Sequence, residues 1–454
     1  MSKESYKIDM CNGPVLPRVI AFSLPLMLSS CLQLLFNAAD VIVVGRFAGS
    51  ESLAAVGSTT TLISLLTNLF IGFSIGANVN VALTLGNRDD AGTRDNVHTA
   101  VALSLISGAA LVVLGLLFAR PMLSWMGTPP DVIDKASLYL TIIFIGMPSN
   151  MAYNFGSAIL RAMGDTRRPL YFLSAAGVLN VILNLVFVIV FRMDVAGVAL
   201  ATILSETLSA CLILACLCRA GGPCRLNLRR LYLHPDRLKR MLHIGLPAGI
   251  QSALFSFSNV LIQSSINSFG SVVMAGSSAG ASIENFVYIS MNAVHQATVS
   301  FVSQNNGAGK PERIGRIFVS CLGLVTVIGL VMGGAVNLFS VPLLSIYSSS
   351  PDVIAAGQIR LLWISAPYFL CGVMEVVMGV MRGLGYAITP MLVALSGACL
   401  FRVVWLATVF AWFPTLPVLY LSYPVSWVLT AGIHFLTYLY ARKHHPLFRG
   451  RWEG

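Results

Sequence analysis

Carboxyl groups occur inside segments of this chain that are otherwise long and apolar. Asp40, Glu206, Glu284 and Glu375 lie in such segments, and Arg402 is the one basic residue well within one. An ionised side chain at the centre of a bilayer costs at least about 2.5 kcal/mol, so such a residue indicates a functional site by default. The alternative is a residue near a span end whose side chain reaches the interface. The chemistry open to buried carboxylates is the uptake and release of a cation.

Asp40 ends a polar stripe. Gln33, Asn37 and Asp40 are spaced i, i+4, i+7 within the apolar segment 19–45, so they share one helix face. A polar face in an apolar helix is expected to line a cavity. Pro25, farther toward the cytoplasm, removes a backbone donor and gives the helix a place to bend. We predict that Asp40 couples to a proton or a sodium ion; the alternative is a structural, hydrogen-bonded aspartate.

Three further pairs of polar residues, each spaced i, i+4, present oxygen atoms on one helix face. They are Asn150 and Asn154, Asn180 and Asn184, and Thr202 and Glu206. A hard cation such as sodium takes several such oxygens. The alternative is hydrogen bonding between helices, the ordinary use of Asn and Thr in spans. We predict that a substrate cavity is lined by the residues of these faces outside the coupling set: Gln33, Asn37, Asn150, Asn154 and Glu206.

The second half of the chain is not chemically equivalent to the first. Where the first half has Asp40, it has Ile262 and its neighbours, with no carboxylate. It carries Glu284 and Glu375 instead, which we predict to help bind cargo. His295, in the same long segment as Glu284, is interpreted as a packing residue.

The elements that hold these residues are membrane spans. The 454 residues are 56% hydrophobic and 10% charged, with a mean hydropathy of +0.80, whereas a soluble domain carries about 25% charged residues. Spans need roughly 20 apolar residues. The sequence predicts twelve helices: 19–45, 52–85, 97–119, 136–160, 170–191, 195–217, 241–268, 275–305, 317–344, 358–381, 391–412 and 419–441.

An internal duplication organises these spans. RAMGDTRRP at 161–169 recurs as RGLGYAITP at 382–390, and PDVI at 130–133 recurs at 351–354, both with an offset of 221. The fold class is therefore an all-α polytopic membrane protein with two six-helix lobes. An even number of spans makes the repeats parallel, related by a pseudo-two-fold axis along the membrane normal. We predict lobes at 1–217 and 241–441, a basic cytoplasmic linker at 218–240 and a basic tail at 442–454.

The repeated motif lies at the cytoplasmic exits of 136–160 and 358–381. Arg161 and Arg382 are expected to anchor these helix ends at the headgroups, Gly permits the turn and Pro opens the next helix. The functional alternative is a gate or hinge, which would involve Arg161, Arg382 and Pro25.

Basic residues follow the positive-inside rule. With a cytoplasmic N-terminus, 23 of the 29 Lys and Arg fall in cytoplasmic segments. This predicts a multi-pass protein of the plasma membrane with both termini in the cytoplasm. The net charge of +11 is thereby explained without a nucleic-acid partner. We expect a monomer in the lipid bilayer.

The sequence has no motif of an ATP-driven pump or of a zinc protease, because GxxxxGK[ST] and HExxH do not occur. Four cysteines cluster at 211–224 without a histidine at ligand spacing, so no metal site is expected. A duplicated, very hydrophobic chain is a candidate transporter, and by elimination we expect its energy source to be an ion gradient, as in a secondary active transporter. No cofactor is expected beyond a bound proton or sodium ion.

The chain resembles the multidrug and toxic compound extrusion (MATE) transporters, over about 14–441. Pro25, FNAADVIVVGRFAG at 36–49, LNVILNLVFV at 179–188, SQNNGAGK at 303–310 and the two R-x-x-G-x4-P copies carry the resemblance. It implies two six-helix bundles facing a central cleft. It also implies alternating-access export of cationic or amphipathic organic compounds, including drugs, in exchange for sodium ions or protons.

The resemblance also implies a cation site in the N-terminal lobe, formed by Asp40, Asn180, Asn184 and Thr202. The family often has Asp at the position of Asn184. One fewer carboxylate weakens sodium binding, so both coupling ions stay open. Glu284 and Glu375 match the acidic residues of the C-terminal lobe only loosely.

Two other functions are alternatives. A lipid-linked oligosaccharide flippase of the same superfamily should have a cavity rich in Arg and Lys to hold pyrophosphate, and Arg402 alone does not provide it. An intramembrane transferase would need clustered Asp or a His–Asp/Glu constellation at a membrane face, and the sequence has none.

Overall fold

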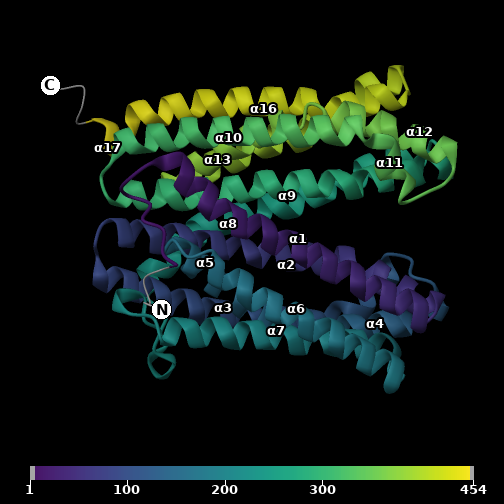
Figure 1. Ribbon diagram of the computed structural model, residues 1–454, viewed down its shortest axis with the longest axis horizontal. Coiled ribbons are helices and arrows are strands. Elements are labelled where there is room, and N and C mark those ends of the chain that lie inside the picture. Colours follow the sequence, from purple (N-terminus) through teal and green to yellow (C-terminus); the bar gives the residue numbers. More distant parts are fainter. Residues whose placement is uncertain (1–5, 450–454) are drawn as a thin grey trace. The chain divides into compact units, whose positions relative to one another are not determined.

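The computed structural model describes residues 6–449, without the side chains of Ser50 and Arg449. Within that range the regular structure is entirely helical (Figure 1). The helices of the first half are α1 (Val15–Phe47), α2 (Ser50–Gly86), α3 (Asp90–Trp125), α4 (Pro130–Ile145), α5 (Met147–Ala162), α6 (Arg167–Leu185) and α7 (Asp194–Cys218). Those of the second half are α8 (Pro235–Asn267), α9 (Ser271–Gly307), α10 (Pro311–Leu338), α11 (Ser340–Ser345), α12 (Pro351–Arg360), α13 (Phe369–Gly383), α14 (Ile388–Ala394), α15 (Phe401–Trp405), α16 (Leu416–His444) and α17 (Pro446–Arg449).

Short irregular helices extend several of these elements. π-Helical turns follow α6, α12, α14 and α15, at η1 (Val186–Val190), η4 (Leu361–Ser365), η5 (Leu395–Leu400) and η6 (Leu406–Phe410). Two 3₁₀ turns, η2 (Gly222–Cys224) and η3 (Leu228–Arg230), lie between α7 and α8.

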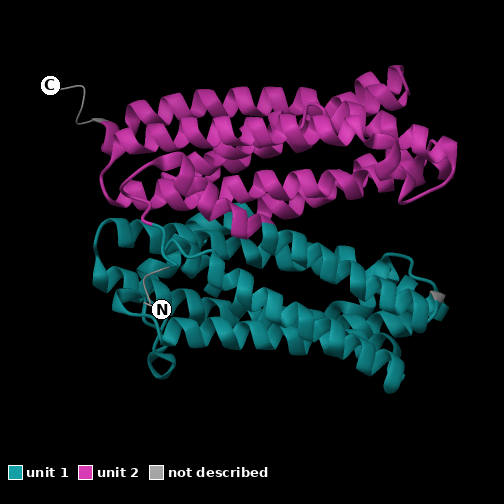
Figure 2. Cartoon of the chain, viewed as in Figure 1, with its two compact units in different colours: residues 1–8, 28–249 teal, residues 9–27, 250–454 magenta. Residues whose placement is uncertain are grey.

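The chain forms two compact units (Figure 2). Unit 1 consists of the residues up to Ile8 together with Leu28–Gly249, and unit 2 consists of Asp9–Met27 and the chain from Ile250 onward. The first residues of α1 thus belong to unit 2, and the first residues of α8 to unit 1. The boundaries 1–217, 218–240, 241–441 and 442–454 stay predictions.

The helices match the predicted spans in number. Nine described helices are long and apolar enough to cross a membrane, and two bent pairs raise the number to eleven. The remaining predicted span, 275–305, is α9, which has 37 residues but many Ser, Asn and Gln side chains. The bent pairs are 130–145 with 147–162, at 47°, and 351–365 with 369–383, at 40°.

The backbone repeats the duplication seen in the sequence. Gly164 and Gly385, the glycines of the two motif copies, have φ of 86° and 96°. This left-handed conformation ends α5 and α13, and glycine adopts it without steric penalty. Pro169 and Pro390 then lie in the first turns of α6 and α14. The predicted turn at the motif is confirmed in both copies.

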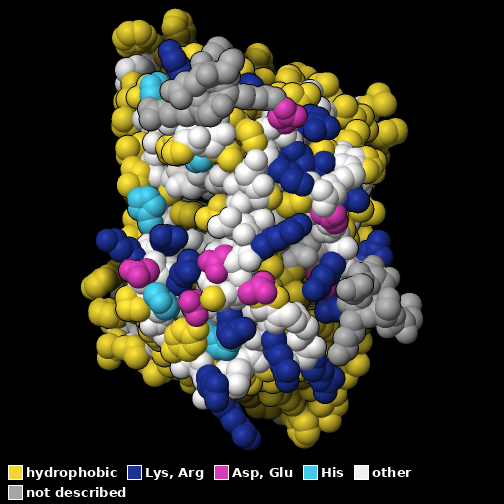
Figure 3. Space-filling view, turned by 90° about the vertical axis from the view of Figure 1, so that its left-hand side faces the viewer, with side chains coloured by type: hydrophobic (Ala, Val, Ile, Leu, Met, Phe, Trp, Pro, Cys, Tyr) yellow, Lys and Arg dark blue, Asp and Glu magenta, His cyan; other side chains and the backbone are white. Residues whose placement is uncertain are grey.

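Basic side chains gather at one end of the helices, which Figure 3 shows face-on. Within unit 1, part of this end is the connection between α7 and α8, which is attached to α3. The backbone N–H of Asn227 donates to Nε2 of His98 at 3.1 Å, and the ring of Tyr232 stacks on His98 at 5.5 Å. The Tyr232 hydroxyl donates to Asp95. The basic connection is therefore a folded part of unit 1.

In unit 2 the segment before α1 is held by the turn between α9 and α10. Arg313 donates to the carbonyl oxygens of Met10, Asn12 and Gly13, at 3.1, 2.6 and 2.8 Å. Lys310, the last residue of the SQNNGAGK stretch, donates to the carbonyl of Cys11 at 2.9 Å. We call residues 9–13 the N-terminal strap. The strap fixes the start of α1 to unit 2.

Candidate functional site

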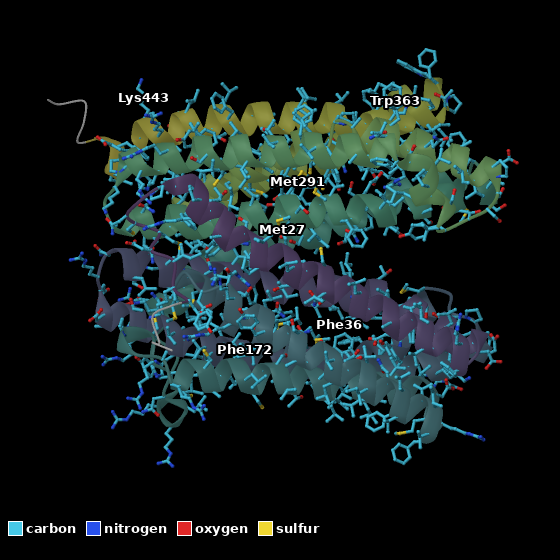
Figure 4. All side chains as sticks on the ribbon, viewed as in Figure 1. Met27, Phe36, Phe172, Met291, Trp363 and Lys443 are labelled. Atoms are coloured by element: carbon cyan, nitrogen blue, oxygen red, sulfur yellow. The ribbon has the colours of Figure 1, made fainter. Side chains whose placement is uncertain are left out.

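Asp40 on α1 is positioned by the packing of α1 on α6. A Cβ atom added at Gly177 would overlap with the ring of Phe36, so glycine is required for this approach. Phe36, labelled in Figure 4, lies one turn before Asp40, and Gly177 lies two turns before Asn184. The contact therefore sets the height of Asp40 against Asn184, whose Nδ2 donates to Oδ1 of Asp40.

Asn184 connects Asp40 to a second amide of the predicted coupling set. Its Nδ2 lies 3.3 Å from Oδ1 of Asn180, one turn earlier on α6. Both asparagines are buried, with 0% exposure for Asn184 and 5% for Asn180. Oδ1 of Asn184 is buried without a hydrogen-bond donor. An unsatisfied buried acceptor next to a carboxylate is suited to the reversible binding of a hydrogen-bond donor or a cation.

Thr202 on α7 contributes less to this group. Its hydroxyl donates to the backbone carbonyl of Val198 at 2.9 Å, within its own helix. The hydroxyl proton of Thr202 is therefore engaged in this hydrogen bond, but its oxygen atom can still accept a hydrogen bond.

Glu206, one turn after Thr202, is held by α5. Nδ2 of Asn150 donates to Oε1 of Glu206 at 2.9 Å. Asn154 in turn donates to the side-chain and backbone oxygens of Asn150, both at 2.9 Å. The amide of Asn150 is thereby oriented with its donor toward Glu206. The three predicted cavity residues form one chain of hydrogen bonds.

Asp40 and Glu206 belong to the same electrostatic environment. Their charges lie within interaction range of each other, and Tyr139 on α4 lies within range of both. Neither carboxylate takes part in an ion pair among the described residues. Tyr139 was not predicted from the sequence as a site residue. The duplication could have indicated it, because Tyr139 in the first repeat corresponds to Arg360 in the second.

The rest of the α1 stripe is more open. Gln33 and Asn37 are exposed, and Asp40 is half-buried. Pro25 lies inside α1, which continues as a helix through it, three residues before the chain passes into unit 1 at Leu28. The roles of Gln33 and Asn37 in a cavity and of Pro25 in bending stay predictions.

Glu284 in unit 2 has a very different environment. Nη2 of Arg360 lies 2.8 Å from Oε2 of Glu284, and Nε lies 3.1 Å from Oε1. Nη1 of Arg360 donates to Ser277 at 2.8 Å. Its guanidinium also lies over the Tyr420 ring at 5.7 Å. Arg360 was not singled out from the sequence, and it lies buried in a candidate span.

Glu375 on α13 meets His295 on α9. Nδ1 of His295 lies 2.7 Å from the carbonyl oxygen of Glu375 and 3.4 Å from its Oε2. Arg382, one of the two motif arginines, is 5% exposed and donates to Oε1 of Gln251 at 2.9 Å. Its guanidinium is thus turned into the unit, whereas Arg161 is half-buried.

The structure therefore forms two hydrogen-bonded groups in unit 1: Asp40 with Asn180 and Asn184, and Glu206 with Asn150 and Asn154. In unit 2, Glu284 is paired with Arg360, and Glu375 lies beside His295. The described residues contain no group of three or more His, Cys, Asp or Glu that could hold a metal. The chemistry available in unit 1 is the binding of a proton or a monovalent cation by carboxylates.

Comparison with known proteins gives one family model that matches both halves. The model, described as MatE, matches residues 25–186 and 247–408. The two matched segments correspond to the two copies of the duplication.

Individual relatives and structures agree with this match. The probable multidrug resistance protein YpnP of Bacillus subtilis (strain 168) is 29% identical, over 96% of this chain and 97% of its own. An FAD transporter of Shewanella oneidensis is 25% identical, over 76% and 77%. A solved structure described as MATE in complex with MaL6 is 22% identical, with a TM-score of 0.88 over 95% of this chain and 97% of that one. The likeness to the solved structure establishes the fold.

Proposed function

Because the chain belongs to the MatE family, we propose that it is an ion-coupled antiporter that exports cationic or amphipathic organic compounds by alternating access. Members of this family are secondary transporters of small molecules, so the chain is a membrane transporter and not an enzyme. The antiport reaction and its coupling ion, a proton or sodium, are our proposal. No cofactor is required beyond that ion.

One observation carries the proposal: the carboxyl group of Asp40 has an amide partner and no basic one. Asn184 donates to Asp40, and no ion pair of the described residues includes Asp40. A carboxylate in a membrane span without a fixed counter-charge favours binding of a mobile cation. Asn180, Asn184 and Thr202 supply the neighbouring oxygen atoms.

In the proposed cycle, Asp40 takes up a proton or a sodium ion from the outside. Its charge is then neutralised, which changes the polar contacts of this face of α1 and allows α1 to bend near Pro25. Affinity for the cationic cargo falls, and the cargo leaves outward. Loss of the coupling ion on the cytoplasmic side restores the charge and the affinity for the next cargo.

The proposed cargo is cationic because the polar groups of the candidate cavity are acidic or neutral. We assign to this cavity Gln33, Asn37, Asn150, Asn154 and Glu206 of unit 1, and we propose that Glu284 and Glu375 of unit 2 help to bind cargo. Arg161 and Arg382 are proposed to act with Pro25 in gating. The chain is a multi-pass protein of the cell membrane, as its bacterial relatives are. We propose that both termini are cytoplasmic and that it acts as a monomer.

The lipid-linked oligosaccharide flippase is not favoured. The basic side chains buried in unit 2 are engaged: Arg360 is neutralised by Glu284. Arg402 donates to Ser426 at 3.0 Å and lies 4.1 Å from the centre of the Tyr423 ring. A pyrophosphate group would require free guanidinium or ammonium groups. The family assignment likewise leaves no support for a transferase.

The proposed role of Asp40 is tested by export of ethidium from cells. Asp40→Asn keeps the size and the hydrogen-bonding capacity of the side chain but removes its charge. We expect this variant to reach the membrane in normal amount and to lose gradient-driven export. Export at the rate of the unaltered protein would remove Asp40 from the coupling role.

A further inference from the structure

Unit 1 contains a second carboxylate, Glu206, with the same local chemistry as Asp40. Each accepts a hydrogen bond from one asparagine of a neighbouring helix, Asn184 for Asp40 and Asn150 for Glu206. The two carboxylates lie within electrostatic range of each other. Neither belongs to an ion pair of the described residues. Two negative charges in this setting repel each other and lack a fixed counter-ion.

The amide of Asn184 gives an independent indication that a ligand enters here. Asn184 is 0% exposed, and its Nδ2 serves Asp40 and Asn180. Its Oδ1 is buried with no hydrogen-bond donor. A buried carbonyl oxygen left without a partner costs about 1–3 kcal/mol. A protonated carboxyl group or a cationic nitrogen donor would satisfy this oxygen, but a carboxylate would not.

Among the described residues, those that interact with this pair carry no positive charge. Tyr139 of α4 lies within range of both carboxylates, and it is neutral near physiological pH. α6 contributes the amides of Asn180 and Asn184, and α5 contributes that of Asn150. Lys135, at the start of α4, is already paired with Glu51 and Asp194 at 3.2 and 3.1 Å. A half-buried carboxylate in an apolar span, with one amide donor and no paired cation, is destabilised in its ionised form.

We propose that Asp40 and Glu206 form a single two-proton site, at which an organic dication is exchanged for two protons and a monocation for one. This inference rests on the proposed antiport function and adds to it the coupling ion, its number and a class of cargo. Without cargo, both carboxyl groups carry protons and the site is neutral. A dication displaces both protons, and the site again has no net charge.

Charge is conserved in each exchange. With a monocation, one proton leaves, the remaining carboxyl group keeps its proton, and the single carboxylate balances the cargo. With a dication, two O–H bonds break, two protons leave to solvent, and two carboxylates face two positive charges. In both cases the buried site stays neutral, which avoids the cost of net charge in an apolar environment.

The test is the number of protons released per cargo bound. It uses the full-length chain purified in detergent, with pentamidine as the dication and tetraphenylphosphonium as the monocation. Titration calorimetry in buffers of different ionisation enthalpy gives the proton count directly. At mildly acidic pH the pair predicts release of about two protons per pentamidine and about one per tetraphenylphosphonium.

Variants assign the second proton to Glu206. Glu206→Gln should reduce the count for pentamidine to about one, as should Asp40→Asn, whereas Glu206→Asp should restore about two. Glu51→Gln is the matched control, because Glu51 is an accessible glutamate of unit 1 paired with Lys135, and it should keep the full count. Size-exclusion profile and melting temperature establish that each variant is folded.

Three results would overturn the inference: equal proton counts for the two cations, a pentamidine count unchanged by Glu206→Gln, or binding of neither cation. These outcomes are separate from failure of the proposed function. If gradient-driven export requires Asp40 but Glu206→Gln leaves the number of released protons unchanged, the antiport function is supported and the two-proton site is contradicted. If Asp40→Asn exports normally, the proposed coupling role itself fails.

Discussion

Arg360 and Glu284 form a bidentate ion pair in the interior of unit 2, with Nη2 and Oε2 2.8 Å apart and Nε and Oε1 3.1 Å apart. Both are nearly inaccessible, at 8% and 5% exposure. In the first repeat the position of Arg360 is held by Tyr139, which has no charge to offer Asp40 or Glu206. The two copies of the duplication have thus diverged: in unit 2 an arginine neutralises Glu284, whereas in unit 1 neither Asp40 nor Glu206 belongs to an ion pair of the described residues.

The ion pair predicts strong coupling between its two residues. Removing one partner leaves a buried charge, so Arg360→Gln or Glu284→Gln alone should destabilise the protein by about 3–5 kcal/mol. The double variant leaves two amides that can bond to each other, and it should be destabilised less than the sum of the single changes. Thermal unfolding in detergent measures all three. Additive effects would contradict the role of the pair.

The N-terminal strap should depend on Arg313. Arg313→Ala removes three charge-assisted hydrogen bonds to the carbonyls of Met10, Asn12 and Gly13, each worth about 1.5–3 kcal/mol. We expect hydrogen–deuterium exchange of residues 9–14 to accelerate by at least about tenfold. Arg316→Ala, at an exposed position of the same helix, is the control. Asn305 also donates to the carbonyl oxygen of Met10, at 3.0 Å, so unchanged exchange in Arg313→Ala would show that Lys310 and Asn305 suffice to hold the strap.

The two motif glycines provide a matched comparison. Gly164→Ala and Gly385→Ala both place a side chain at a left-handed position, with φ of 86° and 96°, which costs about 1–2 kcal/mol. A Cβ at Gly164 would also overlap with the carbonyl oxygen of Ile8, whereas at Gly385 no atom lies within 4 Å. Gly164→Ala should therefore lower the melting temperature more than Gly385→Ala. Equal shifts would mean that the segment around Ile8 moves aside freely.

Cys224 reports on the attachment of the connection between α7 and α8. Burial raises the pKa of its thiol to about 12, so at mildly alkaline pH it stays protonated and unreactive. His98→Ala removes the acceptor for Asn227 and the ring under Tyr232, and alkylation of Cys224 should rise about tenfold or more. Peptide mass spectrometry measures the rate. His444→Ala, on the exposed end of α16, should leave it unchanged; if His98→Ala also does, other contacts hold the connection.

The sequence predicted the helices well because apolar runs of span length have few other structures available. It did not predict that 136–160 and 358–381 each belong to a bent pair of helices. Pro148 and Pro367 mark these bends, but a proline shows only that a helix is interrupted, and the direction of the bend comes from packing.

The sequence predicted which residues belong to the candidate site, but it did not predict which of them form hydrogen bonds with one another. Asp40, Asn184 and Glu206 stand out as polar residues in apolar helices. Which amide meets which carboxylate depends on the rotation of one helix against another, as the contact of Phe36 with Gly177 illustrates. The burial of Arg360 was not predicted, because it depends on pairing with Glu284, which lies 76 positions away in the sequence.

The most direct test of the account is transport by the full-length chain in proteoliposomes with proton and sodium gradients imposed separately. The account predicts that an imposed proton gradient alone drives movement of an organic cation, that a sodium gradient alone does not, and that Asp40→Asn abolishes the movement. Sodium-driven transport that requires Asp40 would keep the antiporter and contradict the proton pair at Asp40 and Glu206. Transport that persists in Asp40→Asn, or that neither gradient drives, would contradict the central claim.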